Sequence, residues 1–470
     1  MSMGVHVGHG GRKPHAATTA RLHLGTTIDE LQRISTCMIG APVPASLAHQ
    51  AVIGMEMSLL RQGWPVGRAL GALPDVRKQL GLGRPAFREA ITVLEARGLL
   101  DVRRGPGGGL FVGAPALEDV VGAVLMYLAL AGETAACIVE FRLVVWRMVV
   151  SAAIQRGVVP SAHGDPRGFA IDLAERTRNP TMVLLVQLVD MLVRTTACGD
   201  APDSNAALDA AIRAGDLGAA HAQLDELVGP IAADAPIIAL DFAERAFSLS
   251  GRKSAMALAA RLTHELSDRS ATQEAEWQTA ERLGYTDAVV RQARRILQDF
   301  GLVRCRQGRR GAELAPPTAP TGVIRLLAPC LMASAMSPLD EREAISFLLG
   351  YAPVLAVRRG TAGGAAPVVR SIPLPGPDAF EVLTLENHLL EMSGNSLLAI
   401  VVRSLGVANI LAAGDPLPPE DVREVDEINR SLLQAIERGD AAAVDTLTRA
   451  KLAIMQRPAV RHCGRMQGRS

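Results

Sequence analysis

The feature that most constrains this chain is an internal repeat. Residues 281–314 align without gaps on residues 78–111 at a constant offset of 203 positions, and both copies contain Leu-Gly, Gly-Leu and Arg-x-Gly at matching places. A second repeat, at an offset of 224, relates residues 205–227 to residues 429–451. Repeats of this kind indicate duplicated structural units. We therefore expect a tandem pair, in which each half holds a small domain followed by a helical domain.

Composition favours helices for the cores of these domains. Hydrophobic residues make up 49% of the chain but aromatic residues only 3%, so the cores must consist of Ala, Leu and Val, which suit closely packed helices better than an aromatic-rich β-sandwich. The expected fold class is mainly α. The expected segments are a flexible N-terminal segment (1–44), two small domains (45–114 and 252–316), two helical domains (115–247 and 320–458) and a flexible tail (459–470).

The first small domain has the clearest local pattern. Apolar residues follow a helical period over residues 46–63, a short helix ends at residues 78–81, and another helix covers residues 85–98. Residues 99–112 then form two strand-like runs around the Gly105–Gly109 tip, which predicts a β-hairpin. Three helices followed by a two-stranded hairpin form the winged-helix arrangement of DNA-binding proteins.

These residues resemble the GntR family of transcriptional regulators. The resemblance covers residues 46–112 well and residues 255–314 more weakly. The helical parts are similar to the effector domain of the FadR branch, through SGN at 393–395 and AIxxGD at 211–216 and 435–440. The resemblance implies two winged-helix domains alternating with two all-helical bundles similar to the FadR C-terminal domain. It also implies a bacterial regulator, expected to be a repressor, that binds double-stranded operator DNA under the control of a small molecule.

Two features of the first winged helix are candidates for contacting DNA. Arg84 and Arg88 lie one turn apart at the start of the expected recognition helix, where guanidinium groups reach guanine edges and phosphates; a solvated helix face is the alternative. The hairpin tip combines arginines with side-chain-free backbone, which suits close approach to phosphates or the minor groove. The expected contacts are Arg84, Pro85, Arg88, Arg103, Arg104, Gly107 and Gly108, together with Arg291, Arg306 and Arg309 in the second copy.

The second winged helix departs from the family pattern at the position that matches Arg84. Asp287 stands there, and its carboxylate would be repelled by phosphates. In the first copy, the arginine of the family's first-helix motif is replaced by Pro74. Residues 45–113 hold nine basic and five acidic side chains and residues 252–313 hold twelve and eight, so each segment carries +4, which suits docking on phosphates. We expect an asymmetric operator with one strongly read half-site, because the second winged helix is degenerate.

The metal site of many FadR-like effector domains is not expected here. Its histidine positions fall on Ala170, Asn205 and Leu227 in the first copy and on Glu386, Asn429 and Lys451 in the second. Leucine cannot bind a metal and an ammonium group has no lone pair to give, so we expect no metal cofactor. Arg142 and Arg342, each in an acid-x-Arg pattern, are candidates for binding a carboxylate of the effector, with an internal ion pair as the alternative.

Other classes of protein find little support. The longest apolar run, Val120 to Gly132, is too short to cross a bilayer, and the N-terminus lacks a signal-peptide core. The six cysteines form no CxxC pair, as expected for thiols in a reducing cytoplasm. No catalytic grouping with the required spacing is present, so we expect no enzyme. The alternative function is a ligand-sensing or protein-interaction module with degenerate winged helices.

The duplication suggests an internal pairing of the two halves. We expect the helical domains to pack as an intramolecular pseudo-dimer and to bury the apolar faces of Val120–Leu130 and Ile324–Leu331. The two recognition helices would then lie one DNA turn apart, which is about 34 Å. A homodimer that presents four winged helices is the alternative.

Overall fold

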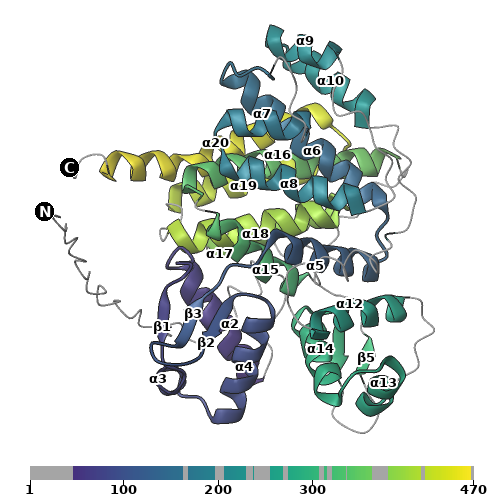
Figure 1. Ribbon diagram of the computed structural model, residues 1–470. Helices are drawn as coiled ribbons and strands as arrows, with labels where there is room; N and C mark the ends of the chain where they lie inside the picture. Colours follow the sequence, from purple (N-terminus) through teal and green to yellow (C-terminus); the bar gives the residue numbers. More distant parts are fainter. Residues whose placement is uncertain are drawn as a thin grey trace, which may run out of the picture.

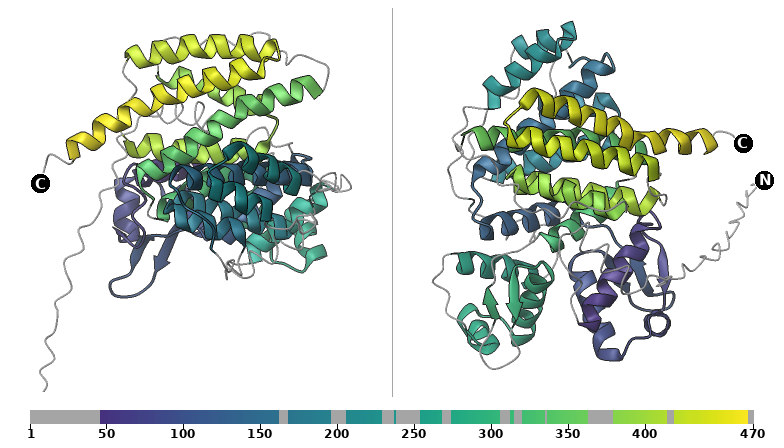
Figure 2. Two further views of the ribbon diagram at one scale, coloured as in Figure 1. Left: turned by 90° about the horizontal axis from the view of Figure 1, so that it is seen from above. Right: turned by 180° about the vertical axis from the view of Figure 1, so that it is seen from behind.

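The computed structural model describes residues 46–161, 168–195, 206–228, 237, 254–267, 274–305, 312–314, 320–334, 336–362, 379–413 and 419–466. The expected segment 1–44 and parts of several loops lie outside these residues. The described chain is mainly helical, as the composition predicted, with short strands confined to two places. Two small units lie side by side beneath a larger helical body (Figure 1), and the view from behind in Figure 2 shows the same division.

The first small unit (residues 46–113) contains three helices and a three-stranded sheet. The helices are α2 (Leu47–Leu60), α3 (Leu73–Gln79) and α4 (Arg84–Ala96), and the strands are β1 (Ala69–Gly71), β2 (Leu100–Arg103) and β3 (Gly109–Val112). The sheet is antiparallel in the order β1-β3-β2. The hairpin lies where the sequence predicted it, whereas β1, which is only three residues long, was not predicted.

One contact fixes this sheet against α2, and another brings two of its strands together. The indole nitrogen of the buried Trp64, just after α2, donates a hydrogen bond to the carbonyl oxygen of Gly113 at 2.8 Å. At Gly109, an added Cβ would lie 2.5 Å from the carbonyl oxygen of Gly71, so β3 can approach β1 only because residue 109 has no side chain. The hairpin is therefore anchored at its base.

The second small unit (residues 254–314) repeats most of these elements. It contains α12 (Ser254–Ser267), α13 (Glu276–Leu283), α14 (Asp287–Asp299) and a two-stranded antiparallel sheet of β4 (Val303–Cys305) and β5 (Ala312–Leu314). The α14 helix is strongly amphipathic, and Val290, Ala293 and Leu297 on its apolar face are buried. The helices α3 and α4 therefore have counterparts in α13 and α14 at the offset seen in the sequence.

The helical body consists of two halves with the same packing scheme. The first helical half contains α5 (Leu117–Leu130), α6 (Ala135–Gln155), α7 (Phe169–Thr177), α8 (Pro180–Thr195), α9 (Ala206–Ala214) and α10 (Leu217–Val228). The second contains α15 (Thr321–Ala333), α16 (Pro338–Ala362), α17 (Ala379–Met392), α18 (Ser396–Ala413), α19 (Pro419–Glu437) and α20 (Ala441–Met466). α6 packs against α7, α8, α9 and α10, just as α16 packs against α17, α18, α19 and α20.

The last helix is longer than expected. α20 continues to Met466 and projects from the helical body (Figure 2). Residues 459–466, which we had assigned to a flexible tail, are therefore helical.

Contacts between the two helical halves come in matched pairs. α5 packs against α15 and α6 against α16, while α6 contacts α18 and α16 contacts α8. Val120 to Leu128 in α5 are buried, and so are Ile324 to Leu331 in α15. One continuous apolar core extends from the first small unit through both helical halves. Each half therefore uses the same surfaces to contact the other.

Asn179, immediately before α8, joins the first helical half to the second. Its side-chain Nδ2 donates to Glu343 Oε2 at 2.9 Å and to the carbonyl oxygen of Asp340 at 3.2 Å, both in α16. Its Oδ1 accepts from the backbone N–H of Thr181 at 2.9 Å and so caps α8. Arg156 donates to the same Glu343 oxygen at 2.6 Å. We call this arrangement the first Asn clamp.

Asn395, immediately before α18, makes the reciprocal contacts. Its Nδ2 donates to Glu140 Oε2 at 2.7 Å and to the carbonyl oxygen of Cys137 at 3.0 Å, both in α6. Arg359 donates to the same Glu140 oxygen at 2.8 Å. Cys137, Glu140 and Arg359 occupy the positions that match Asp340, Glu343 and Arg156 of the first clamp. This second Asn clamp shows that the halves are joined by a two-fold-like exchange of equivalent contacts.

Candidate nucleic-acid interface

The start of α4 presents unpaired cations. Gly83 precedes the helix, Pro85 lies in its first turn, and Arg84 and Arg88 are both exposed. In the part of the chain that the structure describes, neither guanidinium has a hydrogen-bond or ion-pair partner. Both are therefore available to an anionic ligand at the end of a helix whose opposite face, including Phe87 and Ile91, is buried.

The hairpin tip adds a further free cation. Arg104 is exposed and has no partner among the described residues, whereas the Arg103 guanidinium lies over the Phe111 ring at 4.0 Å. The turn beyond them is tight. An added Cβ at Gly108 would lie 2.4 Å from the Arg103 carbonyl oxygen, and Gly107 has a φ of 77°. These positions require glycine, so the tip exposes backbone beside the arginines.

In the second small unit, carboxylates neutralise Arg291, which matches Arg88, and the nearby Arg282. Arg291, expected to contact DNA, has its Nε 3.0 Å from Glu276 Oε2. Arg282 pairs with Glu265 at 2.8 Å and with Glu274 at 3.0 Å, and hydrogen bonds to these two carboxylates raise the pKa of Arg282. The structure therefore does not present Arg291 as a free cation, in contrast to Arg88 at the matching position.

Further residues of the second unit also differ from the first. Asp287, which begins α14 at the position that matches Arg84, is exposed. Arg294 is buried and donates to the Glu274 carbonyl oxygen at 2.8 Å and to Thr279 Oγ1 at 3.0 Å. Arg306 and Arg309 lie outside the described residues.

The two helices expected to read DNA are in contact with each other. α4 packs against α14, and Glu89 Oε1 lies 3.5 Å from Arg295 Nε. The expected separation of one DNA turn, about 34 Å, is therefore wrong for this structure. The sequence could not reveal this contact, because it joins residues about two hundred positions apart.

A ring of four charged side chains lies where the small units meet the helical body. Arg97 Nη1 contacts Glu56 Oε1 at 2.6 Å and Asp299 Oδ2 at 3.0 Å, while Arg325 contacts Glu56 Oε2 at 2.6 Å and Asp299 Oδ1 at 3.1 Å. We call these four residues the charge ring. Each side chain is at most 5% exposed, so their charges compensate one another in a low-dielectric environment.

The charge ring joins four segments of the chain. Glu56 lies in α2, Arg97 follows α4, Asp299 ends α14 and Arg325 lies in α15. Burial raises the pKa of Asp299, but the two arginines lower it more, so it remains below its ordinary value. Sequence reasoning missed this ring. The one available signal was Glu56, an acidic residue within an otherwise apolar helix.

The two arginines expected to hold an effector do not occupy matched sites. Arg142 is buried on α6 with its guanidinium 4.2 Å from the Trp146 ring centre, and Arg342 is half-buried on α16. At the offset of 203 residues, Arg142 is matched by Ile345. Glu140, which defined the acid-x-Arg pattern, takes part in the second Asn clamp instead.

A polar cluster inside the helical body was not anticipated. Arg147 on α6 donates to Asp225 on α10 and to the hydroxyl of Tyr351 on α16. Ser151 Oγ lies 3.1 Å from His221 Nε2 but donates to the Arg147 carbonyl oxygen at 2.7 Å. Burial and Arg147 lower the pKa of His221. Because the Ser151 proton is directed to the backbone, this pair lacks the arrangement of an activated nucleophile.

The residues at the positions of the metal ligands of FadR-like effector domains do not fit a metal in the first helical half. Ala170 is buried in α7 and Leu227 is half-buried in α10; neither side chain has a lone pair. Asn205 lies outside the described residues. No group of three or more His, Cys, Asp or Glu side chains within the described ranges is placed to hold a metal ion.

In the second helical half, an ion pair occupies the matching place. Glu386 on α17 pairs with Lys451 on α20, and both side chains are buried. Asn429 on α19 is fully buried, and its side-chain amide has no hydrogen-bond partner among the described residues. The lysine supplies a positive charge beside Glu386, so these residues do not fit a metal ion either.

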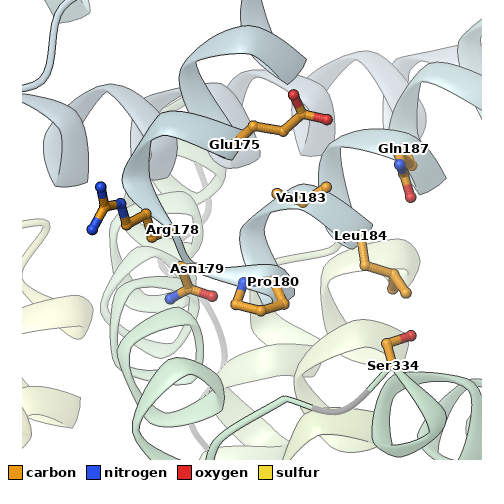
Figure 3. A pocket seen from close by; sticks show the side chains of 8 residues that line it. All are labelled: Glu175, Arg178, Asn179, Pro180, Val183, Leu184, Gln187 and Ser334. Atoms are coloured by element: carbon orange, nitrogen blue, oxygen red, sulfur yellow. The ribbon is translucent and has the colours of Figure 1, made fainter.

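A shallow groove of about 370 Å³ lies where the two helical halves meet (Figure 3). It is lined by Glu175, Arg178, Asn179, Pro180, Val183, Leu184, Gln187 and Ser334. Five of these eight residues are polar or charged, so the groove lacks the predominantly apolar lining of a typical small-molecule site. Neither Arg142 nor Arg342 lines it.

Comparison of the chain with models of protein families, with curated proteins and with solved structures finds no match. Among the described residues, no helix combines the length and the apolar character needed to cross a lipid bilayer.

Proposed function

We propose that this protein is a DNA-binding transcriptional regulator of the GntR type, under the control of a small molecule. In this proposal each small unit is a winged helix and each helical half is an effector-type bundle. The first small unit reads the DNA sequence through the start of α4 and touches the backbone through its hairpin tip.

The observation that carries the proposal is the difference between the two small units. Arg84, Arg88 and Arg104 are exposed and unpaired among the described residues, whereas Arg291 is held by a carboxylate of its own unit. An exposed arginine without a partner attracts phosphate and can form two hydrogen bonds with guanine. This difference supports DNA reading by the first unit alone.

The test is the affinity of the full chain for DNA from upstream of its own gene. Replacing either Arg84 or Arg88 with Ala is expected to cost about 1–3 kcal/mol of binding free energy, which is about fivefold to 150-fold in Kd at fixed salt. Arg449→Ala is the control, because Arg449 is a 76% exposed cation of α20, in the helical body. If Arg84→Ala and Arg88→Ala both bind as tightly as the control, the proposed interface is wrong.

One observation favours a different role for the second small unit. Trp277 at the start of α13 is 58% exposed, and the neighbouring Arg291 is neutralised by Glu276. An exposed indole whose neighbouring arginine is already paired with a carboxylate is typical of a protein contact rather than of a DNA contact. The second candidate function is therefore a protein-interaction role for this unit, which is compatible with DNA reading by the first.

A further inference from the structure

A second cleft lies between the two helices that contact each other. A cleft of about 200 Å³ separates α4 from α14 and is lined by Glu89, Thr92, Val93, Ala288, Arg291, Gln292, Arg295 and Ile296. Its floor is formed by Val93 and Ile296, which are 4% and 1% exposed. This volume suits a small ion or metabolite better than a drug-sized ligand.

The charges that line the cleft favour an anion. Arg291 and Arg295 lie one turn apart on α14, with side chains that are 52% and 41% exposed. Glu89 is the only carboxylate of the lining, so the lining carries a net charge of +1. Glu89 lies 3.5 Å from Arg295, which is longer than a charge-assisted hydrogen bond. Arg295 is therefore only loosely held, whereas a ligand would have to displace Glu276 from Arg291, whose Nε it contacts at 3.0 Å.

We propose that this cleft binds a small dianion, either a phosphate group or a dicarboxylate, between Arg291 and Arg295. The ligand would compete with Glu276 for Arg291 and with Glu89 for Arg295. Its negative charge would lie beside Glu89, which follows Arg88 in the sequence of α4. Bound ligand should therefore weaken the attraction of α4 for DNA phosphates. This link to DNA rests on the proposed function, but anion binding itself does not.

The chain contains a natural reporter for such binding. Of its three tryptophans, Trp64 and Trp146 are 1% and 2% exposed, whereas Trp277 is 58% exposed. Trp277 follows Glu276 directly, so release of Glu276 from Arg291 should change its fluorescence. Inorganic phosphate and succinate would be titrated into the full chain at constant ionic strength, with chloride as the balancing anion.

We expect a saturable fluorescence change with low-millimolar or tighter half-saturation, and no such change in Trp277→Phe. Arg291→Ala and Arg295→Ala should each weaken binding by about tenfold. Arg261→Ala is the matched control, because Arg261 is an exposed arginine of the same unit outside the cleft. Glu89→Gln should bind more tightly, because it removes the internal competitor, and a gain of this kind cannot come from misfolding.

The source of the anion is decided by measuring DNA binding in the same variants. Phosphate or succinate that binds and weakens DNA affinity identifies a small effector. Lower DNA affinity of Arg291→Ala and Arg295→Ala without small-anion binding assigns the cleft to a DNA phosphate instead. The anion site is refuted if neither effect occurs, or if Glu89→Gln does not bind the anion more tightly. Loss of DNA binding in Arg84→Ala tests the proposed function separately.

Discussion

Arg97 and Phe300 occupy matching positions in the two repeats, and in the structure they face each other. The Arg97 guanidinium lies 5.7 Å from the centre of the Phe300 ring. Equivalent residues of the two repeats therefore lie next to each other at the junction between the halves. The chemistry there is nevertheless unequal. The first copy contributes Glu56 and Arg97 to the charge ring, whereas the second contributes Asp299 and Arg325 from other positions. Sequence divergence has therefore made this junction complementary rather than identical.

Removing one carboxylate of the ring should be costly. We expect Asp299→Asn to lower the free energy of unfolding by about 3–5 kcal/mol, because Arg97 and Arg325 would share one remaining buried carboxylate. The measurement is urea unfolding of the full chain. Asp287→Asn in the same helix is the control, since Asp287 is exposed and its loss should cost less than about 1 kcal/mol. Equal effects in the two variants would contradict the compensation described for the ring.

The ring should also give stability a defined dependence on acid. Arg325, Arg97 and His49 lower the pKa of Asp299, against burial, while Glu56 is the second carboxylate of the ring. A carboxyl group with a lowered folded-state pKa stabilises the fold above the unfolded value of about 4 and loses this contribution as the pH falls through the folded value. Below about pH 4, the free energy of unfolding should therefore fall less steeply with decreasing pH in Asp299→Asn than in the wild type.

Among elements, the Asn clamps offer a direct test of reciprocity. Asn395→Ser preserves a helix-capping oxygen at α18 but is too short to reach Glu140. We expect this change and Glu140→Gln to be coupled by about 0.5–3 kcal/mol in a double-mutant cycle on unfolding free energy. Combining Asn395→Ser with Glu343→Gln, which alters the other clamp, should show additive effects. Coupling in both cycles, or in neither, would contradict two separate clamps.

The elements that were predictable from sequence are those with a local cause. The amphipathic period of the sequence predicted the position of α4 correctly, and the glycine-rich tip predicted the position of the hairpin of β2 and β3. β1 has only three residues and little pattern of its own, because pairing with β3 creates it. The acid-x-Arg pattern at Arg142 and Arg342 was misleading, since the repeat aligns Glu140 with Glu343. The cross-half partners of Asn179 and Asn395 depend on tertiary packing and leave no local pattern.

At the scale of the whole molecule, the contact between α4 and α14 limits how DNA can be bound. The two helices cannot enter successive major grooves while they remain packed together. We expect one chain to protect one short site, with strong contacts on the side of the first small unit. Light scattering should find a monomer both free and bound to DNA. A stable dimer at nanomolar concentration, or two equally protected half-sites one turn apart, would contradict this expectation.

The two Asn clamps also bear on how a cell could control such a protein. When a regulator pairs two separate chains, dilution dissolves the pair, so DNA occupancy falls more steeply than the amount of protein. Here each clamp closes on a partner that belongs to the same chain, whose local concentration is fixed by the connecting polypeptide. We expect DNA occupancy to rise hyperbolically with the concentration of the protein. Doubling or halving the gene dosage should therefore change DNA occupancy no more than in proportion.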